Sequence, residues 1–321
     1  MKKVSEPSVA DRSDWPSVGR ANGRLKSSLR RMEPIYWLGP ASLLIAGVVV
    51  LPVFFMVWTS FRNIDTVGFD HGWAGLASYR SLFALPDLGP VMTRTVVWLV
   101  SVVSVTMFLS LPLALLLNRQ FPGRRAVRMS LVAPWATSVF MTAIIFRWML
   151  QPQSGLINIV LHAIGLVRNI GLTSAQANWL GRPQAAFVWM IVVAIFVSLP
   201  FTTYTLLAGM QAIPGDIYEA AKVDGASPFR SFVAITLPLL KPAAVVALLI
   251  NVMNVFNSFP IIWEMTRGGP GDLTATSTVF MYQLKSSSIP MAAAMSVVNF
   301  FVVALIVILF LRFSNWKERT I

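Results

Sequence analysis

Three asparagines and a serine lie within one long apolar stretch of the chain. Asn251, Asn254, Asn257 and Ser258 fall inside residues 243–263, where most neighbours are apolar. At about 100° per residue of an α-helix, these four side chains share an arc of about 120°. Each amide offers donors and an acceptor, which suits a hydroxyl-rich ligand. Polar groups within a membrane span are costly, so the row predicts a solute path or hydrogen bonds between helices.

Other side chains in the apolar stretches are candidates for the same path. Tyr204 lies in residues 185–210 and Asn299 in residues 290–313, and we expect both to add polar contacts. Phe256, Phe259 and Trp263 lie beside the asparagine row, where an aromatic ring can stack on the apolar face of a sugar. Hydrogen bonding between helices is the alternative interpretation for the polar members of this set.

Two arginines lie near the ends of apolar stretches. Arg94 and Arg147 each have a long aliphatic stem that lets a guanidinium extend to the membrane interface. A second interpretation is that they attract an anionic solute such as a sugar phosphate or a uronate. Both interpretations remain open from the sequence.

The chain lacks the residue patterns of common catalytic and metal sites. It has no cysteine, and its two histidines, His71 and His162, are far apart, so we expect no metal site. It contains no Gly-x-x-x-x-Gly-Lys-Ser/Thr phosphate loop and no Ser/His/Asp arrangement. We therefore expect no catalytic residue and no cofactor bound by this chain. Because these catalytic patterns are missing, the sequence does not favour a polytopic membrane enzyme.

The composition is that of a polytopic membrane protein. Of the 321 residues, 56% are hydrophobic and 12% are charged. Runs long enough to cross about 30 Å of hydrocarbon predict an all-α fold with six transmembrane helices. We divide the chain into a basic, largely disordered tail over 1–34, a six-helix membrane domain over 35–315 and a short tail over 316–321. The predicted spans are Ile35–Trp58, Pro90–Leu117, Met129–Leu150, Ala185–Met210, Ala243–Trp263 and Pro290–Phe313.

The basic residues are distributed unevenly between the two faces of the membrane. The net charge is +13, and most of the 26 Lys and Arg residues fall in the two tails and in the loops 118–128 and 211–242. Positive charge marks the cytoplasmic face, so both termini are predicted to be cytoplasmic. This distribution favours orientation and contact with anionic lipid over nucleic-acid binding.

The polar segment 211–242 separates the fourth and fifth apolar runs. We expect Asp216 to cap a short helix, with Glu219 completing a capping box. Gly225 stands where the end of that helix requires a positive φ. Ser227 and Pro228 then suit the start of a second helix.

Two prolines follow this second helix. Pro238 and Pro242 are expected to mark its end, before the chain returns to the lipid.

The residue spacing of this segment resembles the EAA loop of bacterial ABC importer permeases. The residues that carry the resemblance are Glu219, Ala220, Ala221, Gly225, Ile235, Leu237 and Pro238. The resemblance covers about residues 35–315 and implies a type I importer permease in the inner membrane. It also implies a coupling helix that docks on a separate ATPase. Its docking residues would be Glu219, Ala220, Ala221, Asp224 and Gly225.

A glycine-rich turn refines the resemblance. Thr266-Arg267-Gly268-Gly269-Pro270-Gly271 is similar to the turn before the last span in carbohydrate importer permeases of the maltose and glycerol-phosphate type. Such permeases work by alternating access with a second permease, two ATPase subunits that hold ATP and Mg, and an extracytoplasmic binding protein. A permease for amino acids, polyamines or phosphonates is the alternative. A stand-alone secondary transporter fits less well, because no intramembrane carboxylate is seen.

Overall fold

A computed structural model describes residues 38–165 and 178–313 of the chain. The predicted tails 1–34 and 316–321 lie outside these ranges. The chain divides into two units, Met1–Phe55 and Met56–Ile321. In the first unit, the described residues are helical and include a π-helical turn, η1 (Ala46–Val50). α2 (Leu51–Ser60) completes an apolar helix that starts at Leu38.

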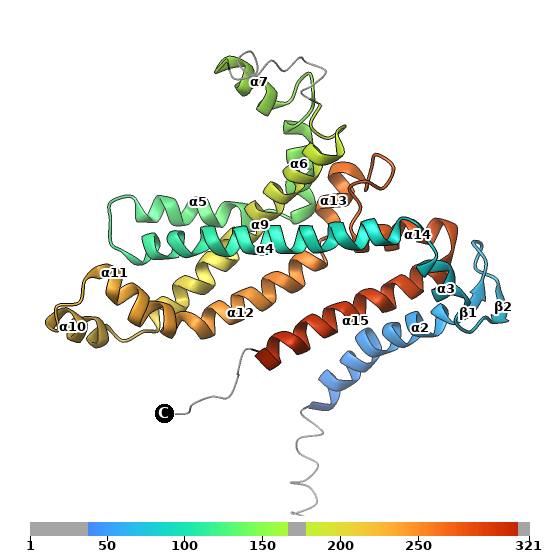
Figure 1. The fold of residues 1–321 in the computed structure, drawn as a ribbon, viewed down its shortest axis with the longest axis horizontal. Coiled ribbons are helices and arrows are strands. Elements are labelled where there is room, and N and C mark those ends of the chain that lie inside the picture. Colours follow the sequence, from blue (N-terminus) through green and yellow to red (C-terminus); the bar gives the residue numbers. More distant parts are fainter. Residues whose placement is uncertain (1–37, 166–177, 314–321) are drawn as a thin grey trace, which may run out of the picture. The chain divides into compact units, whose positions relative to one another are not determined.

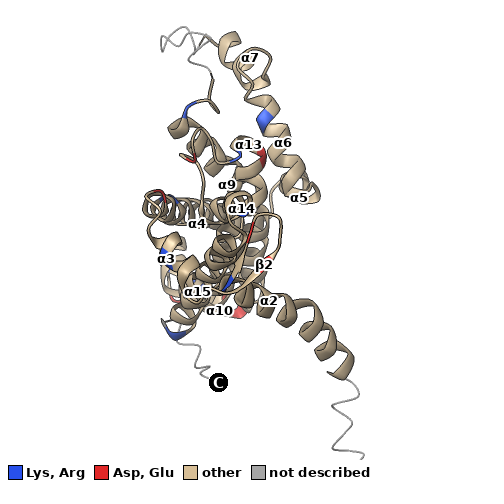
Figure 2. Ribbon diagram, turned by 90° about the vertical axis from the view of Figure 1, so that its right-hand side faces the viewer, with Lys and Arg blue, Asp and Glu red and all other residues tan. Residues whose placement is uncertain are grey.

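The described residues form five helices that are long and apolar enough to cross a membrane. They are Leu38–Ser60, α4 (Leu88–Asn118), α9 (Pro183–Gln211), the run Pro228–Thr266, and α15 (Ile289–Phe313). A sixth is obtained if the bent pair α5 (Arg124–Ala136) and α6 (Val139–Met149) counts as one span. Figure 2 shows α2 drawn in tan along its length, without the colours of charged residues. The predicted all-α membrane fold is confirmed.

The third predicted span, Met129–Leu150, is wrong as a single helix. α5 and α6 meet at a bend of 98°, with Thr137 and Ser138 in extended conformations between them. The Thr137 hydroxyl donates to the Pro134 carbonyl oxygen at 3.0 Å, and it lies 3.0 Å from the Thr142 hydroxyl. Hydroxyl groups thus replace part of the backbone bonding that the interrupted helix loses.

The fifth span also departs from the prediction. Pro238 and Pro242 do not end the helix, which runs from α11 (Pro228–Ser231) through η2 (Phe232–Thr236) into α12 (Leu237–Phe256). The π-helical turn η2 ends at Thr236, two residues before Pro238, and widens the helix close to the position where a backbone N–H is missing. The helix is interrupted instead at residues 257–258, before α13 (Phe259–Thr266).

Three long helices form the centre of the second unit. α4, α9 and α12 contact one another, and Figure 1 shows them side by side. The indole of Trp98 in α4 is buried and donates to the Val255 carbonyl oxygen of α12 at 3.0 Å. Gly209 lets α9 approach α12 closely, because a Cβ there would overlap the Ala243 Cβ. Small residues at such crossings are typical of membrane helix pairs.

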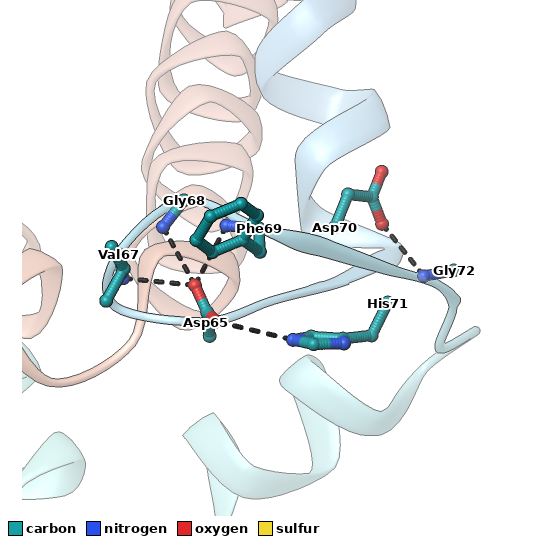
Figure 3. Close-up of polar contacts among 7 residues, drawn as sticks. All are labelled: Asp65, Val67, Gly68, Phe69, Asp70, His71 and Gly72. Carbon is teal, nitrogen blue, oxygen red and sulfur yellow. Dashed lines mark hydrogen bonds and ion pairs between the residues drawn. The ribbon is translucent and has the colours of Figure 1, made fainter.

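A short hairpin lies near the start of the second unit. β1 (Arg62–Ile64) pairs antiparallel with β2 (Asp70–Trp73). Figure 3 shows the Asp65 carboxylate accepting backbone N–H groups of the connecting turn, with Oδ1 2.8 Å from the Gly68 and Phe69 nitrogens. These hydrogen bonds, that of Phe69 above all, lower the pKa of Asp65. The hairpin precedes α3 (Ala77–Phe83), which packs on α15.

Two further helices lie between the predicted spans. α7 (Leu156–Ala163) lies between the third and the fourth predicted span. α14 (Ser277–Ser287) was not predicted. Between α13 and α14, Arg267, Gly268 and Gly271 have positive φ, so the glycine-rich segment is a tight turn as expected.

Candidate functional site

A cavity of about 370 Å³ lies where two broken spans meet α9. The bend between α5 and α6 forms one wall, α9 forms a second, and the interruption between α12 and α13 forms the third. This volume is within the range of small-molecule sites. The lining residues are Trp135, Val139, Ala194, Val197, Ser198, Phe201, Asn251, Asn254, Val255, Asn257, Ser258, Pro260 and Ile261.

All four members of the predicted polar row line this cavity. Asn251 is 2% exposed, and its Nδ2 donates to the Thr202 hydroxyl at 3.4 Å. The Asn251 Oδ1 is buried without a hydrogen-bond partner among the described residues. Asn257 Nδ2 donates to the Met253 carbonyl oxygen at 3.0 Å. Asn254 and Asn257 are exposed at the cavity, so their amides can donate to and accept from a ligand there.

The break after α12 turns this row toward the cavity. Ser258 has ψ of 75° and leaves the helical path, and Phe259 N donates to the Asn257 carbonyl oxygen at 2.8 Å. Pro260 starts the new helix, where its missing N–H costs little. The interruption therefore leaves the side chains of Asn254, Asn257 and Ser258 at the cavity surface.

Two predicted path residues lie elsewhere. The Tyr204 hydroxyl donates to the Arg128 carbonyl oxygen at 2.8 Å and joins α9 to α5. Asn299 of α15 is 7% exposed, and its Nδ2 donates to the Ser277 carbonyl oxygen at 3.3 Å. The structure therefore gives both residues contacts between helices and does not bring them to the asparagine row.

The two arginines bond to backbone carbonyl groups. Arg94 donates to the carbonyl oxygens of Asp272 and Ala275 at 3.0 and 3.3 Å. Arg147 Nη1 donates to the Glu264 carbonyl oxygen at 3.2 Å. These contacts hold the glycine-rich turn against α4 and join α6 to α13. Neither arginine is among the residues that line the cavity.

The aromatic side chains at the cavity differ from those expected. Phe259 and Trp263 stack on each other, and both make edge contacts with Tyr282, away from the lining set. Trp135 and Phe201 line the cavity instead, with ring centroids 6.5 Å apart. No sequence pattern indicated Trp135, because its position depends on the bend after α5.

Ser198 is a polar cavity residue that the sequence reasoning missed. It lies on α9 inside a predicted span, and its side chain has no recorded hydrogen bond within the described ranges. The rule that polar residues in spans are functional candidates would have found it.

The predicted coupling segment forms a capped helix followed by a tight turn. α10 (Gly215–Val223) ends in a Schellman motif, in which Ala226 N donates to the Ala221 carbonyl oxygen and Gly225 N to that of Lys222. Gly225 has φ of 74°, as predicted. Ser227 caps the next helix by accepting from Arg230 N at 3.3 Å, which is also as predicted.

The predicted start of α10 is wrong. Its N-cap is Pro214, without a side-chain cap, and Asp216 lies in the first turn. Glu219 therefore completes no capping box. The Pro214 ring fixes φ near the value needed just ahead of the helix, so the chain enters α10 two residues earlier than expected.

The coupling segment presents its predicted docking residues on its surface. Glu219, Ala220, Asp224 and Gly225 are exposed, whereas Ala221 is buried. Large apolar side chains lie beside them, with Val223 88% and Phe229 77% exposed. The Tyr218 hydroxyl lies 3.0 Å from that of Thr236 and fixes α10 to η2. An exposed apolar and acidic surface on a rigid support is suited to a protein partner.

The segment is joined to the cavity through two helices. α9 carries Ser198 and Phe201 at the cavity and ends at Gln211, just before α10. α12 follows α11 and η2 and carries Asn251 and Asn254. At 1.5 Å per residue, Phe201 lies about 15 Å along α9 from the end of that helix at Gln211. A movement of α10 would therefore act on two cavity walls.

A polar cavity among helices long enough to cross a membrane is the arrangement of a membrane-embedded transport protein. The profile of the family "Binding-protein-dependent transport system inner membrane component" matches residues 106–320. The chain belongs to this family of inner-membrane transport components.

Curated relatives match over nearly their whole length. A probable ABC transporter permease of Brucella suis is 36% identical, over 90% of this chain and 99% of its own. The sulfoquinovosyl glycerol transport system permease SmoG of Agrobacterium fabrum is 33% identical, over 99% of this chain and 98% of its own. The trehalose/maltose transport system permease MalF of Thermococcus litoralis is 32% identical, over 87% of this chain and 92% of its own.

A solved structure shares the fold. It is a chain of a bacterial ABC transporter involved in the import of the acidic polysaccharide alginate. It matches with a TM-score of 0.77 and 21% identity, over 92% of this chain and 100% of that chain. The predicted type I importer permease fold is confirmed.

Proposed function

We propose that this chain is a permease subunit of a bacterial ABC importer and that its solute is a carbohydrate. The observation that carries the proposal is the cavity in which Asn251, Asn254, Asn257 and Ser258 meet two aromatic rings. Amides bond sugar hydroxyls in both directions, and aromatic faces pack on sugar C–H groups. The relatives named for trehalose/maltose and sulfoquinovosyl glycerol support this solute class.

ATP hydrolysis takes place on separate subunits. α10 docks on an ATPase through Glu219, Ala220, Ala221, Asp224 and Gly225, and each ATPase of a pair holds ATP and Mg. A second, related permease supplies the other docking helix and completes the path. The solved alginate transporter in complex with a pentasaccharide-bound periplasmic protein supports an extracytoplasmic binding protein as donor of the solute.

The docking helix and both termini face the cytoplasm. The basic loop between α4 and α5 carries Arg119, and this side chain lines a surface hollow with Phe229 and Phe232 of the docking region. The positive loop and α10 are therefore at the same end of the unit. The positive-inside distribution of charge supports the orientation.

The mechanism is alternating access. Closure of the ATPase pair displaces α10, and the Tyr218–Thr236 contact and the turn at Gly225 keep α10 in fixed relation to η2. α9 and α12 then shift together, because they pack closely at Gly209 and Ala243. Since these helices form two cavity walls, the cavity opens to one face of the membrane at a time.

The test is transport by the assembled complex in proteoliposomes. With binding protein outside and ATP inside, we expect uptake of radiolabelled trehalose or of another carbohydrate that the binding protein retains. Without ATP, uptake should be abolished. Solute flux through this chain reconstituted alone would instead indicate a secondary transporter. Retention of only an amino acid, polyamine or phosphonate by the binding protein would contradict the carbohydrate assignment.

A further inference from the structure

The cavity is lined without charge. Among the described residues around it, none is Lys, Arg, Asp or Glu. Its polar atoms come from the amides of Asn251, Asn254 and Asn257 and the hydroxyls of Ser198 and Ser258, and the remaining lining is apolar. An ion that leaves water for such a site loses hydration, and no counter-charge in the lining compensates it.

The two cations considered for anion binding are occupied elsewhere. The Arg94 guanidinium donates to carbonyl oxygens of the turn between α13 and α14, and the Arg147 guanidinium donates to the Glu264 carbonyl oxygen. Both contacts hold backbone segments together. A solute in the cavity therefore meets neither guanidinium as part of the lining.

The exposed amides of the lining add a preference of their own. The side chains of Asn254 and Asn257 are exposed at the cavity. Each amide donates and accepts hydrogen bonds, as a sugar hydroxyl does, but it supplies no charge to offset the hydration that a sulfonate, phosphate or carboxylate would lose.

We infer that this cavity selects an uncharged, polyhydroxylated solute and disfavours sugars that carry a sulfonate, phosphate or carboxylate. The inference rests on the proposed function, because it takes the cavity as part of the solute path. It separates this chain from importers whose solutes are acidic sugars. Its physical basis is a lining that carries amides and hydroxyls but no charged side chain.

The absence of cysteine from the chain allows a direct measurement of charge in the cavity. Asn254→Cys places a single thiol at the lining of the complete transporter. We would measure its rate of modification by three methanethiosulfonates of similar size: hydroxyethyl, sulfonatoethyl and trimethylammonioethyl. The mass of this chain reports the reaction, so cysteines of partner subunits do not interfere. Ser154→Cys, at an exposed turn, is the matched control.

The deciding quantity is the modification rate with the anionic reagent divided by the modification rate with the neutral reagent. We expect this ratio at Asn254→Cys to be equal to or below that at Ser154→Cys, with the cationic reagent likewise not favoured. A ratio about tenfold higher than at the control would reveal a fixed positive charge and overturn the inference. A similar preference for the cationic reagent would overturn it as well, because it would indicate a site for cations.

A third result separates this inference from the proposed function. If no reagent modifies Asn254→Cys while all modify Ser154→Cys, the cavity is closed to solutes and its role in the path is wrong. Ser258 lines the same cavity, so Ser258→Cys shows whether a lack of reaction at Asn254→Cys comes only from a folding defect of that variant. Lack of reaction at both Asn254→Cys and Ser258→Cys would reject the selectivity of the cavity and its role in the solute path. A higher relative rate with the anionic reagent would reject the selectivity alone and leave the proposed importer function unaffected.

Discussion

The turn between α10 and α11 and the cavity beside α12 differ in how far apart in the chain their interacting residues lie. At the turn, Gly225 and Ala226 bond to carbonyl groups no more than five positions earlier. At the cavity, Trp135, Ser198 and Asn254 come together from separate helices. The turn is therefore determined by local backbone chemistry, and the cavity depends on helix packing.

The two regions also differ in what a substitution would disturb. An added Cβ at Gly225 meets nothing within 4 Å, so its cost lies only in the backbone. An added Cβ at Gly209, between α9 and α12, overlaps Ala243. Glycine substitutions at these two positions therefore separate a change in the turn from a change in the packing of α9 against α12.

The largest expected effect is at the helix crossing. Gly209→Val should destabilise the unit by about 3 kcal/mol, because overpacking forces α9 away from α12. We expect a lower Tm for the purified complex and a loss of uptake. Gly215→Ala is the control, since a Cβ there meets nothing within 4 Å. An unchanged Tm for Gly209→Val would show that the crossing tolerates a wider separation.

An intermediate effect is expected at the turn. Gly225→Val should cost about 1–2 kcal/mol, because a β-branched residue is strained at positive φ. The chain should still insert in the membrane, while co-purification of the ATPase and uptake both fall. Gly225→Asn, which tolerates this conformation better, should retain more of both. Normal uptake by the valine variant would contradict a coupling role for this turn.

The smallest effect is expected at the cavity surface. Asn254→Leu removes a polar partner of the solute and should lower uptake about fivefold, which corresponds to about 1 kcal/mol. The complex should assemble normally, because Asn254 is exposed and makes no recorded hydrogen bond in the described part of the chain. Met253→Leu, at the neighbouring position outside the lining, is the control. Equal uptake kinetics in the two variants would assign the asparagine row to helix packing.

Several elements could be predicted from residue order alone. The positive φ at Gly225 and the cap at Ser227 follow from local chemistry and were correctly expected. The polar row 251–258 was also found, because polar groups in an apolar run stand out. The single helix over Met129–Leu150 and the helix end at Pro238 were wrong, since hydroxyl bonding and a π-helical turn altered the outcome.

The sequence by itself determined the membrane class of this protein, the turn at Gly225 with the cap at Ser227, and the polar row that lines the cavity. Only the tertiary structure decided which of those residues share a cavity. Tyr204 and Asn299 bond to other helices, and Arg94 and Arg147 bond to backbone carbonyls, while Trp135 and Ser198 enter the lining. The physical reason is that a turn depends on neighbouring residues, whereas a cavity depends on where distant helices bend, break and pack.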